Sequence, residues 1–271
     1  MFRKVSYIIA ILAVLVLLSA VFTNYSNGSA SNQSLRSSYQ ETISNAEEQA
    51  SLTPLEAIES LNAKSALALS KTGWVYTKEI SKYNSEQKNG TLPDGTIIPS
   101  EYIIESWFYV NEKGLSNEGI TIMSALDATI IQTSISKNNQ VWNSVTNEQD
   151  FWYPQPVSAM DFGFLNEAKE YFKKTGQEPE IVETEVGGRK VAIFTLNEKL
   201  SEPMTLVDEN KAIAGIKTIA IFDIETGDIA NFQKMFIYDD GSEKLNYTSE
   251  FEIQLGIIPP EDILKKIEER K

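Results

Sequence analysis

The longest hydrophobic pattern in the chain lies at its N-terminus. Arg3 and Lys4 are followed by residues 5–23, which are mostly apolar and contain no charged side chain. A helix needs about 20 apolar residues to cross the hydrocarbon core, so this run predicts a transmembrane anchor over 1–23. The basic flank predicts a single-pass protein of the cell membrane whose C-terminal part is extracytoplasmic. The alternative is a cleaved signal peptide, which begins in the same way and would make the protein secreted.

The pattern then changes twice before the first strand. Residues 24–52 are rich in Ser, Asn, Gln and Glu, which predicts a polar tether. The folded domain is expected to span 53–271, and it opens with a helix signal. Thr53 and Glu56 have the spacing of a capping box, and Gly73 is expected to end the helix that they begin.

Beyond Gly73 the apolar period becomes that of strands. Short apolar segments separated by turn residues predict strands at 74–82, 101–111, 119–125, 128–136, 140–145, 181–186, 189–196, 213–224, 229–238 and 244–255. Residues 164–174 and 260–269 predict helices, and residues 197–211 are expected to be irregular. Consecutive strands with short connections pair antiparallel. The expected fold class is α+β, a large curved antiparallel sheet that forms an open or half β-barrel with helices packed on one face.

The predicted strand at 101–111 has bulky side chains on both faces. Trp107 and Tyr109 point one way, while Ile104, Phe108 and Val110 point the other way. This pattern fits a sheet that is covered on one side and lines an apolar cavity or interface on the other. It also fits an ordinary core that is buried on both sides.

Composition excludes much enzyme chemistry. The chain has no His and no Cys, so it has no histidine base, no thiol nucleophile and no disulfide. Zinc, copper, haem and iron–sulfur centres prefer imidazole or thiolate ligands, so no metal and no cofactor is expected. The net charge of −14 disfavours binding to nucleic acid. The pairs Glu183/Glu185 and Glu250/Glu252 are expected to be solvated edges rather than catalytic carboxylates.

Aromatic residues are the best candidates for a binding site. Six of them concentrate in the first half of the predicted domain and could line a groove for an acyl chain or a hydrophobic peptide. They are Trp74, Tyr76, Trp107, Tyr109, Trp142 and Trp152. Core packing is the alternative role for the same residues. The proline-containing break around Trp152 is expected to cap the open face of the sheet as a lid or to plug it.

The element order resembles that of the exported lipoprotein-carrier superfamily, the LolA, LolB and RseB-like half barrels. The likeness lies in the helix at 54–72 that leads into strand 74–82, the meander, the central helix at 164–174 and the hairpins that end at 244–255. It covers roughly residues 50–258 and involves no family-defining motif. The resemblance implies non-enzymatic binding of acyl chains in a concave cavity, or of a segment of a regulatory partner. The predicted anchor departs from the shuttling carriers and favours a fixed sensor or holder.

These observations predict a membrane-anchored extracytoplasmic binding module that is not an enzyme. Its expected partners are the membrane, through the anchor, and a lipid, a hydrophobic peptide or a protein segment. The alternative is an anchored structural or regulatory ectodomain that acts through protein–protein contacts and has no ligand cavity.

Overall fold

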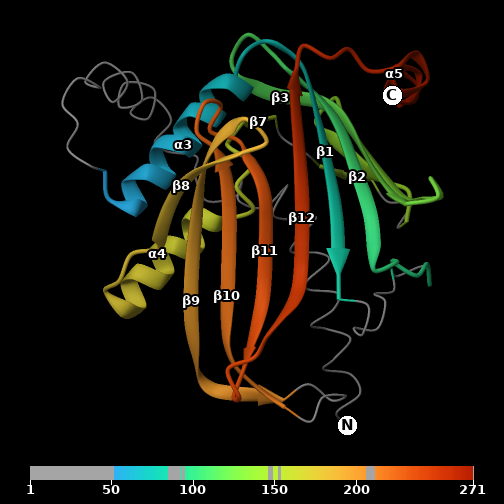
Figure 1. The fold of residues 1–271 in the computed structure, drawn as a ribbon. Coiled ribbons are helices and arrows are strands. Elements are labelled where there is room, and N and C mark those ends of the chain that lie inside the picture. Colours follow the sequence, from blue (N-terminus) through green and yellow to red (C-terminus); the bar gives the residue numbers. More distant parts are fainter. Residues whose placement is uncertain are drawn as a thin grey trace.

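A computed structural model describes residues 52–84, 92, 95–145, 149–151, 154–205 and 211–270 (Figure 1). The predicted anchor over 1–23 and all but the last residue of the predicted tether over 24–52 lie outside these ranges. Of the helices within the described ranges, none combines the length and the hydropathy that a bilayer span requires.

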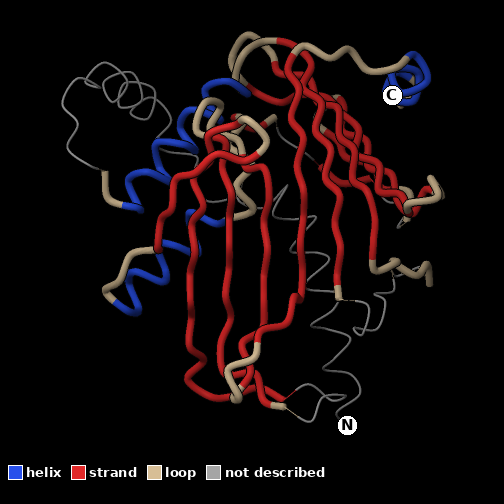
Figure 2. The backbone as a smooth tube through the Cα atoms, in the orientation of Figure 1, coloured by secondary structure: helices blue, strands red, loops and turns tan. Residues whose placement is uncertain are grey.

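The described strands form a twelve-stranded antiparallel sheet in the order β6-β5-β4-β3-β2-β1-β12-β11-β10-β9-β8, with β7 paired to β3. The bounds are β1 Gly73–Tyr83, β2 Glu101–Val110, β3 Leu115–Ala125, β4 Ile130–Lys137, β5 Gln140–Asn143, β6 Gln149–Phe151, β7 Gln155–Pro156, β8 Glu180–Val186, β9 Arg189–Thr205, β10 Ala212–Asp223, β11 Ile229–Tyr238 and β12 Glu243–Leu255. Figure 2 shows these strands as one strongly curved sheet. In the described part of the chain β6 and β8 form its two ends, so the sheet stays open. The predicted α+β class with an open antiparallel sheet is confirmed.

The described residues include the helices α3 Pro54–Leu69, α4 Phe164–Thr175 and α5 Glu261–Glu268. The predicted capping box is present, because the Glu56 amide donates to Thr53 Oγ1 at 3.3 Å and the Thr53 amide donates to Glu56 Oε2 at 2.9 Å. This helix ends at Leu69, so Gly73 does not end it as expected and is instead the first residue of β1. Gly176 ends α4 in the left-handed conformation with a φ of 68°.

Every predicted strand is present, but one expectation about the segment 197–211 is wrong. Strand β9 continues to Thr205, and Asn197, Glu198 and Lys199 pair with β10. Acidic and polar side chains made this segment look irregular. Backbone pairing to a neighbouring strand fixes an extended conformation even where the side chains are polar. The short strands β6 and β7 were also not predicted.

The sheet has two faces, which strand β1 defines clearly. We call the face that carries Val75, Glu79 and Tyr83 the inner face, and the face that carries Trp74 and Tyr76 the outer face. The registers of β1 with β2 and β12 extend the two faces to the neighbouring strands. Side chains alternate along each strand, so residues paired across the sheet share a face.

Two of the three described helices cover the inner face. Helices α3 and α4 pack on it over β9–β12, whereas α5 packs on the outer face against β3 and β4 through Ile263 and Ile267. Figure 1 shows α5 near the C-terminus, well apart from α3 and α4. The expectation that the helices share one face is therefore corrected for α5. The apolar stripe of this short helix packs on the outer face because that face also carries apolar side chains, such as Trp107 and Ile120, that the helix removes from water.

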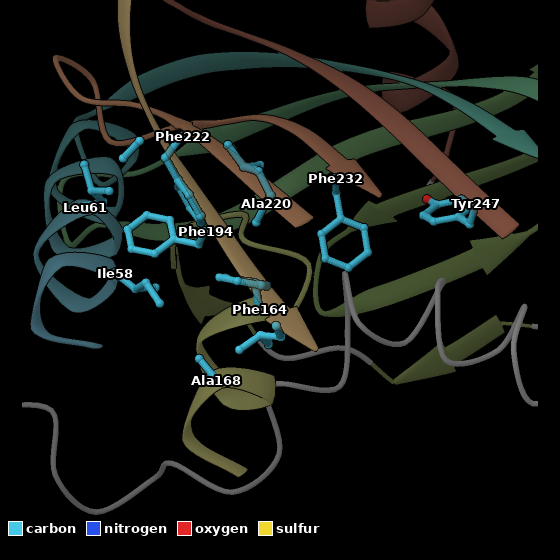
Figure 3. Close-up of a cluster of buried hydrophobic side chains, with 12 residues drawn as sticks. Ile58, Leu61, Phe164, Ala168, Phe194, Ala220, Phe222, Phe232 and Tyr247 are labelled. Carbon is cyan, nitrogen blue, oxygen red and sulfur yellow. The ribbon is translucent and has the colours of Figure 1, made fainter. Parts of the chain in front are cut away.

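The largest core lies between α3, α4 and the inner face of the second half of the sheet. Phe164 of α4 is fully buried, with its ring centroid 6.2 Å from Phe194, 6.1 Å from Phe222 and 6.5 Å from Phe232. Figure 3 shows Ile58 of α3 and Phe164 pointing toward the sheet from the two helices. We call this cluster the helix-covered core. At its end α3 also reaches β1 and β2, where Leu69 packs with Val75 and Val110. Beyond that contact, none of the described helices packs on the inner face of β1–β4.

Candidate ligand pocket

A pocket lies on the inner face beside the contact that Leu69 of α3 makes with β1 and β2. It lies between strands β1–β5 and β12 on one side and residues 157–163 on the other, and its volume is about 160 Å³. Residues 157–163 connect β7 to α4, and we call them the roof. The pocket therefore shares a face with the helix-covered core and adjoins it.

The floor of the pocket is made of small residues. Ser106, Thr121, Ser134 and Ser136 present hydroxyl groups from β2, β3 and β4. Gly119 pairs with Ser136 and has no side chain above the sheet. A Cβ atom at Gly119 would lie 2.7 Å from the Trp107 carbonyl oxygen, so no other residue fits there without a backbone shift. The depth of the pocket follows from this run of short side chains.

Apolar side chains form the walls and the roof. Ile104 and Phe108 come from β2, Phe251 comes from β12, and Val157 and Phe162 come from the roof. The Phe162 ring packs on Phe251 at 4.5 Å between centroids and also reaches Phe232 of the helix-covered core at 5.9 Å. This arrangement can bury an apolar ligand and contains few fixed charges.

Asp161 holds the roof in place. Its carboxylate accepts hydrogen bonds from Asn62 Nδ2 of α3 at 2.6 Å, from the Gly163 amide at 2.9 Å and from the Leu165 amide at 3.1 Å. The bond to Leu165 satisfies one of the free amides in the first turn of α4. The neighbouring Phe162 adopts a φ of 55°, a conformation that few residues other than glycine adopt. The roof is therefore tied to both helices that cover the rest of the inner face.

A buried carboxyl group lies in the pocket wall. Glu79 of β1 is 8% exposed and accepts hydrogen bonds at Oε1 from Ser249 Oγ at 2.7 Å, from Tyr247 OH at 2.9 Å and from Ser81 Oγ. Burial raises the pKa of Glu79 above its ordinary value, and the three hydroxyl donors oppose that shift. The same environment raises the pKa of Tyr83 to about 12, mainly through burial.

The predicted aromatic site lies on the outer face instead. Trp74 packs edge-on against Tyr109 at 5.4 Å, and Tyr76 packs against Trp107 at 4.9 Å while its hydroxyl donates to Glu105. Trp107 borders the pocket, but its side chain belongs to the outer cluster of apolar residues under α5.

Trp142 completes this outer group. It packs against the same cluster, and the Arg270 guanidinium lies 3.5 Å from its ring centroid. The structure thus brings five of the six predicted aromatics together under or beside α5, and Trp152 lies outside the described residues. That these six residues bind a ligand stays a prediction, whereas the two-sided pattern of β2 is confirmed.

Sequence reasoning missed Glu79 and the small residues of the floor. The sequence does contain a signal for Glu79, since alternate positions of β1 share one face. That face carries Val75, Thr77, Glu79, Ser81 and Tyr83. That alternation does not say which face is covered. The partners Tyr247 and Ser249 lie on β12, and only the pairing of β1 with β12 brings them next to Glu79.

Comparisons with known proteins give a general structural similarity. No family model matches the chain, and no curated protein matches it significantly. Similar solved structures include MucB in complex with MucA(peri), with 14% identity over 76% of this chain and a TM-score of 0.37. The chain spans 58% of the MucB chain. They also include LprF from Mycobacterium bovis, with 9% identity over 77% of this chain and 97% of that chain at a TM-score of 0.36.

A LolA superfamily protein from Nitrosomonas europaea is similar as well, with 10% identity over 76% of this chain and 96% of that chain at a TM-score of 0.22. These structures include a member of the superfamily that the sequence resembles. With TM-scores below 0.5 and identities of at most 14%, these similarities carry no argument about what this chain binds.

Proposed function

We propose that this protein is a non-enzymatic binding module that holds an apolar ligand, such as the end of an acyl chain, in the pocket under the roof. The observation that carries the proposal is the pocket itself, a mainly apolar space on the inner face that the protein's own side chains leave open. The helix-covered core shows that the same face can be filled completely, so the space is a local feature of β1–β5.

The size of the pocket supports a chain end rather than a whole lipid. Its volume of about 160 Å³ lies below the usual range of roughly 300–1,000 Å³ for sites that enclose a drug-sized molecule. It is close to that of an apolar cavity of about 150 Å³ that holds benzene. Each methylene group that enters such a space contributes about 0.8 kcal/mol.

The proposal includes a location at a membrane, outside the cytosol. The uncharged run 5–23 after Arg3 and Lys4 supports an anchor with the folded domain on the far side of the bilayer. A module tethered in this way would hold its ligand close to the membrane and would not shuttle between membranes.

The competing hypothesis was an ectodomain without a cavity. It supposes that side chains of the protein fill the concave face throughout. They do so over β9–β12, but the pocket over β1–β5 counts against the hypothesis. A segment of a protein partner could insert an apolar side chain in the same pocket, and the experiment below distinguishes it from a lipid.

Lipid extraction and mass spectrometry of the purified full chain test the proposal. Ser136→Phe places a ring over Gly119 and fills the floor of the pocket, whereas Ser136→Ala removes only the hydroxyl and serves as the matched control. We expect a bound amphiphile with the unaltered protein and with Ser136→Ala, and its loss with Ser136→Phe. Equal lipid content in all three proteins, or no lipid in any of them, would contradict the proposal.

A further inference from the structure

Strand β8 is the long edge of the sheet. Among the described strands it pairs with β9 alone, and at the opposite end of the sheet β6 is only three residues long. Strand β8 has seven residues, pairs with β9 without a register shift and contains neither proline nor lysine. Proteins commonly protect an edge with short strands, bulges, proline or lysine. Strand β8 uses none of these devices.

The backbone of β8 has hydrogen-bonding groups that point away from the sheet. In an antiparallel pair of strands, hydrogen-bonded and non-hydrogen-bonded residue pairs alternate. The carbonyl of Lys190, opposite Glu185, accepts from the Ile224 amide at 3.0 Å on the β10 side, so this residue pair is a non-hydrogen-bonded one. By alternation, the amides and carbonyls of Ile181, Glu183 and Glu185 point to the free side of β8. These groups can pair with a further strand.

The side chains of β8 differ between its two faces. Glu183 pairs with Ala192 of the helix-covered core, so Glu183 and Glu185 lie on the inner face. Val182 and Val186 lie on the outer face, where they are 59% and 57% exposed. A neighbouring strand would therefore meet two carboxylates on one face and two β-branched apolar side chains on the other face.

The carboxylates of β8 are available to a partner of opposite charge. Within the described residues neither Glu183 nor Glu185 forms an ion pair, although Lys190 lies opposite Glu185. The other two glutamates with this spacing, Glu250 and Glu252, lie on β12, which has a strand on each side. Of these two pairs, the one on β8 is the pair that an incoming strand can reach.

We propose that β8 binds an extended segment of another protein, which adds a strand to the sheet and carries lysine or arginine on one face and β-branched residues on the other. Main-chain hydrogen bonds give such strand addition its affinity, and the alternate side chains give it specificity. Cationic side chains opposite Glu183 and Glu185 supply the complementary charge. Strand β8 contributes none of the residues that line the pocket, so this inference goes beyond the proposed function and does not depend on it.

A second copy of this chain is a poor occupant of the same edge. Residues paired across two strands share a face, so two copies of β8 paired with each other would bring their Glu183 and Glu185 side chains together. Like charges directly opposite one another destabilise a sheet. The net charge of −14 also opposes self-association.

Binding of a synthetic strand to the full chain in nanodiscs of zwitterionic lipid tests the inference. The probe is a fluorescent peptide as long as β8 that alternates lysine with valine, and its control has glutamate in place of lysine. Fluorescence anisotropy measures the affinity of each peptide. We expect the lysine peptide to bind and the glutamate peptide to bind at least about tenfold more weakly, because its charges repel those of β8.

Methylated probes separate strand pairing from simple attraction between charges. The amides of alternate residues point to opposite edges of a strand, so N-methylation of either the lysines or the valines blocks one edge of the probe. We expect one methylated peptide to bind about tenfold more weakly than the other, because one set of amides faces β8. Equal weakening by both methylations would overturn the inference, because attraction between charges does not distinguish the two edges.

Substitutions in the protein locate the binding edge. Glu183→Gln together with Glu185→Gln should weaken binding of the lysine peptide about fivefold. The matched control is Glu250→Gln together with Glu252→Gln, which removes the same charge at the same spacing from a strand that has neighbours on both sides. This control should leave the affinity unchanged, and an equal effect of the two double substitutions would contradict the assignment to β8.

A proline tests the backbone contribution. Glu183→Pro removes an amide on the free side of β8 and spares the bonds to β9, so it should abolish binding of the lysine peptide. Circular dichroism shows whether this variant folds, and if it does not, the methylated probes still decide the question.

Failure of the lysine peptide to bind the unaltered protein would overturn the inference. A dimer of the unaltered chain that the peptide dissociates would also overturn it, because the edge would then belong to a second copy. The proposed function stands in each of these cases, because it rests on the pocket.

Discussion

One curved face of the sheet carries both a filled core and an open pocket. Over β9–β12, the helices α3 and α4 supply Ile58, Leu61 and Phe164, which meet phenylalanines of the sheet. At the pocket, β2–β4 present hydroxyls and Gly119, and the roof rather than a helix lies above them. The difference shows that the inner face is not hollow as a whole. The pocket exists where small side chains of the strands lie under the roof rather than under a helix.

The two regions should therefore respond differently to the same kind of change. Removing volume from the helix-covered core leaves an unfilled cavity, whereas adding volume forces strain on a region that is already packed. Adding volume to the pocket uses existing space. Substitutions matched in size provide the sharpest test of this contrast.

The largest expected effect is the loss of Phe164. Phe164→Ala removes a fully buried ring that contacts Phe194, Phe222 and Phe232, and it should lower the free energy of unfolding by about 3–5 kcal/mol. Denaturant unfolding measures this change. Phe172→Ala on the same helix is the control, because Phe172 is 41% exposed and its truncation should cost about 0.5 kcal/mol. Similar losses in both variants would mean that α4 does not seal a core.

Adding a larger side chain separates the two regions more directly. Ala220→Leu enlarges a fully buried residue of the helix-covered core and should destabilise the protein by about 1–3 kcal/mol. Ser136→Leu makes a similar increase in the pocket and should change stability by no more than about 0.5 kcal/mol. Thermal unfolding of both variants gives the comparison. If Ser136→Leu is as costly as Ala220→Leu, the pocket is not an open space in solution.

The smallest expected effect depends on pH and concerns Glu79. Burial raises the pKa of this carboxyl, so the folded state holds the proton more tightly than the unfolded chain does. The stability that protonated Glu79 contributes is full below its ordinary value of 4.5 and is lost as the pH rises through the raised folded pKa. The hydrogen bonds from Ser81, Ser249 and Tyr247 reduce the size of this loss.

Glu79→Gln removes this titration. The free energy of unfolding of Glu79→Gln relative to the unaltered protein should therefore rise with pH across that interval and become constant above it. Denaturant unfolding in a pH series that starts below 4.5 measures the difference. The matched control is Glu250→Gln, which removes the same charge from an exposed position on the outer face of β12. A difference that is flat or falls with pH would show that burial does not govern Glu79.

Much of the architecture could be predicted from local patterns. The capping box at Thr53 and the glycine at Gly176 marked helix ends correctly because helix ends are decided by neighbouring residues. Strict alternation placed Tyr247 and Ser249 on one side of β12, and both are buried there. The segment after Leu196 was misjudged because its extended conformation depends on pairing with β10 and not on its own polarity.

The candidate site was predicted less well. The aromatics Trp74 and Trp107 were candidates for lining a groove or for packing in a core, and they lie on the outer face, where α5 covers Trp107. Aromatic content indicates apolar burial without saying whether a ligand or a helix of the same chain provides it. The floor of the pocket is instead made by serine and glycine residues, which a search for hydrophobic patterns in the sequence does not detect.

By itself, the sequence determined the order of helices and strands, the antiparallel pairing and the division of each strand into two faces, because these depend on residues close together in the chain. Only the tertiary structure decided which face is filled, which is open and where α5 packs. These outcomes depend on contacts between residues far apart in sequence, such as Asn62 with Asp161 and Glu79 with Ser249. Periodicity shows which side chains share a face of a strand. Which element covers that face depends on residues elsewhere in the chain.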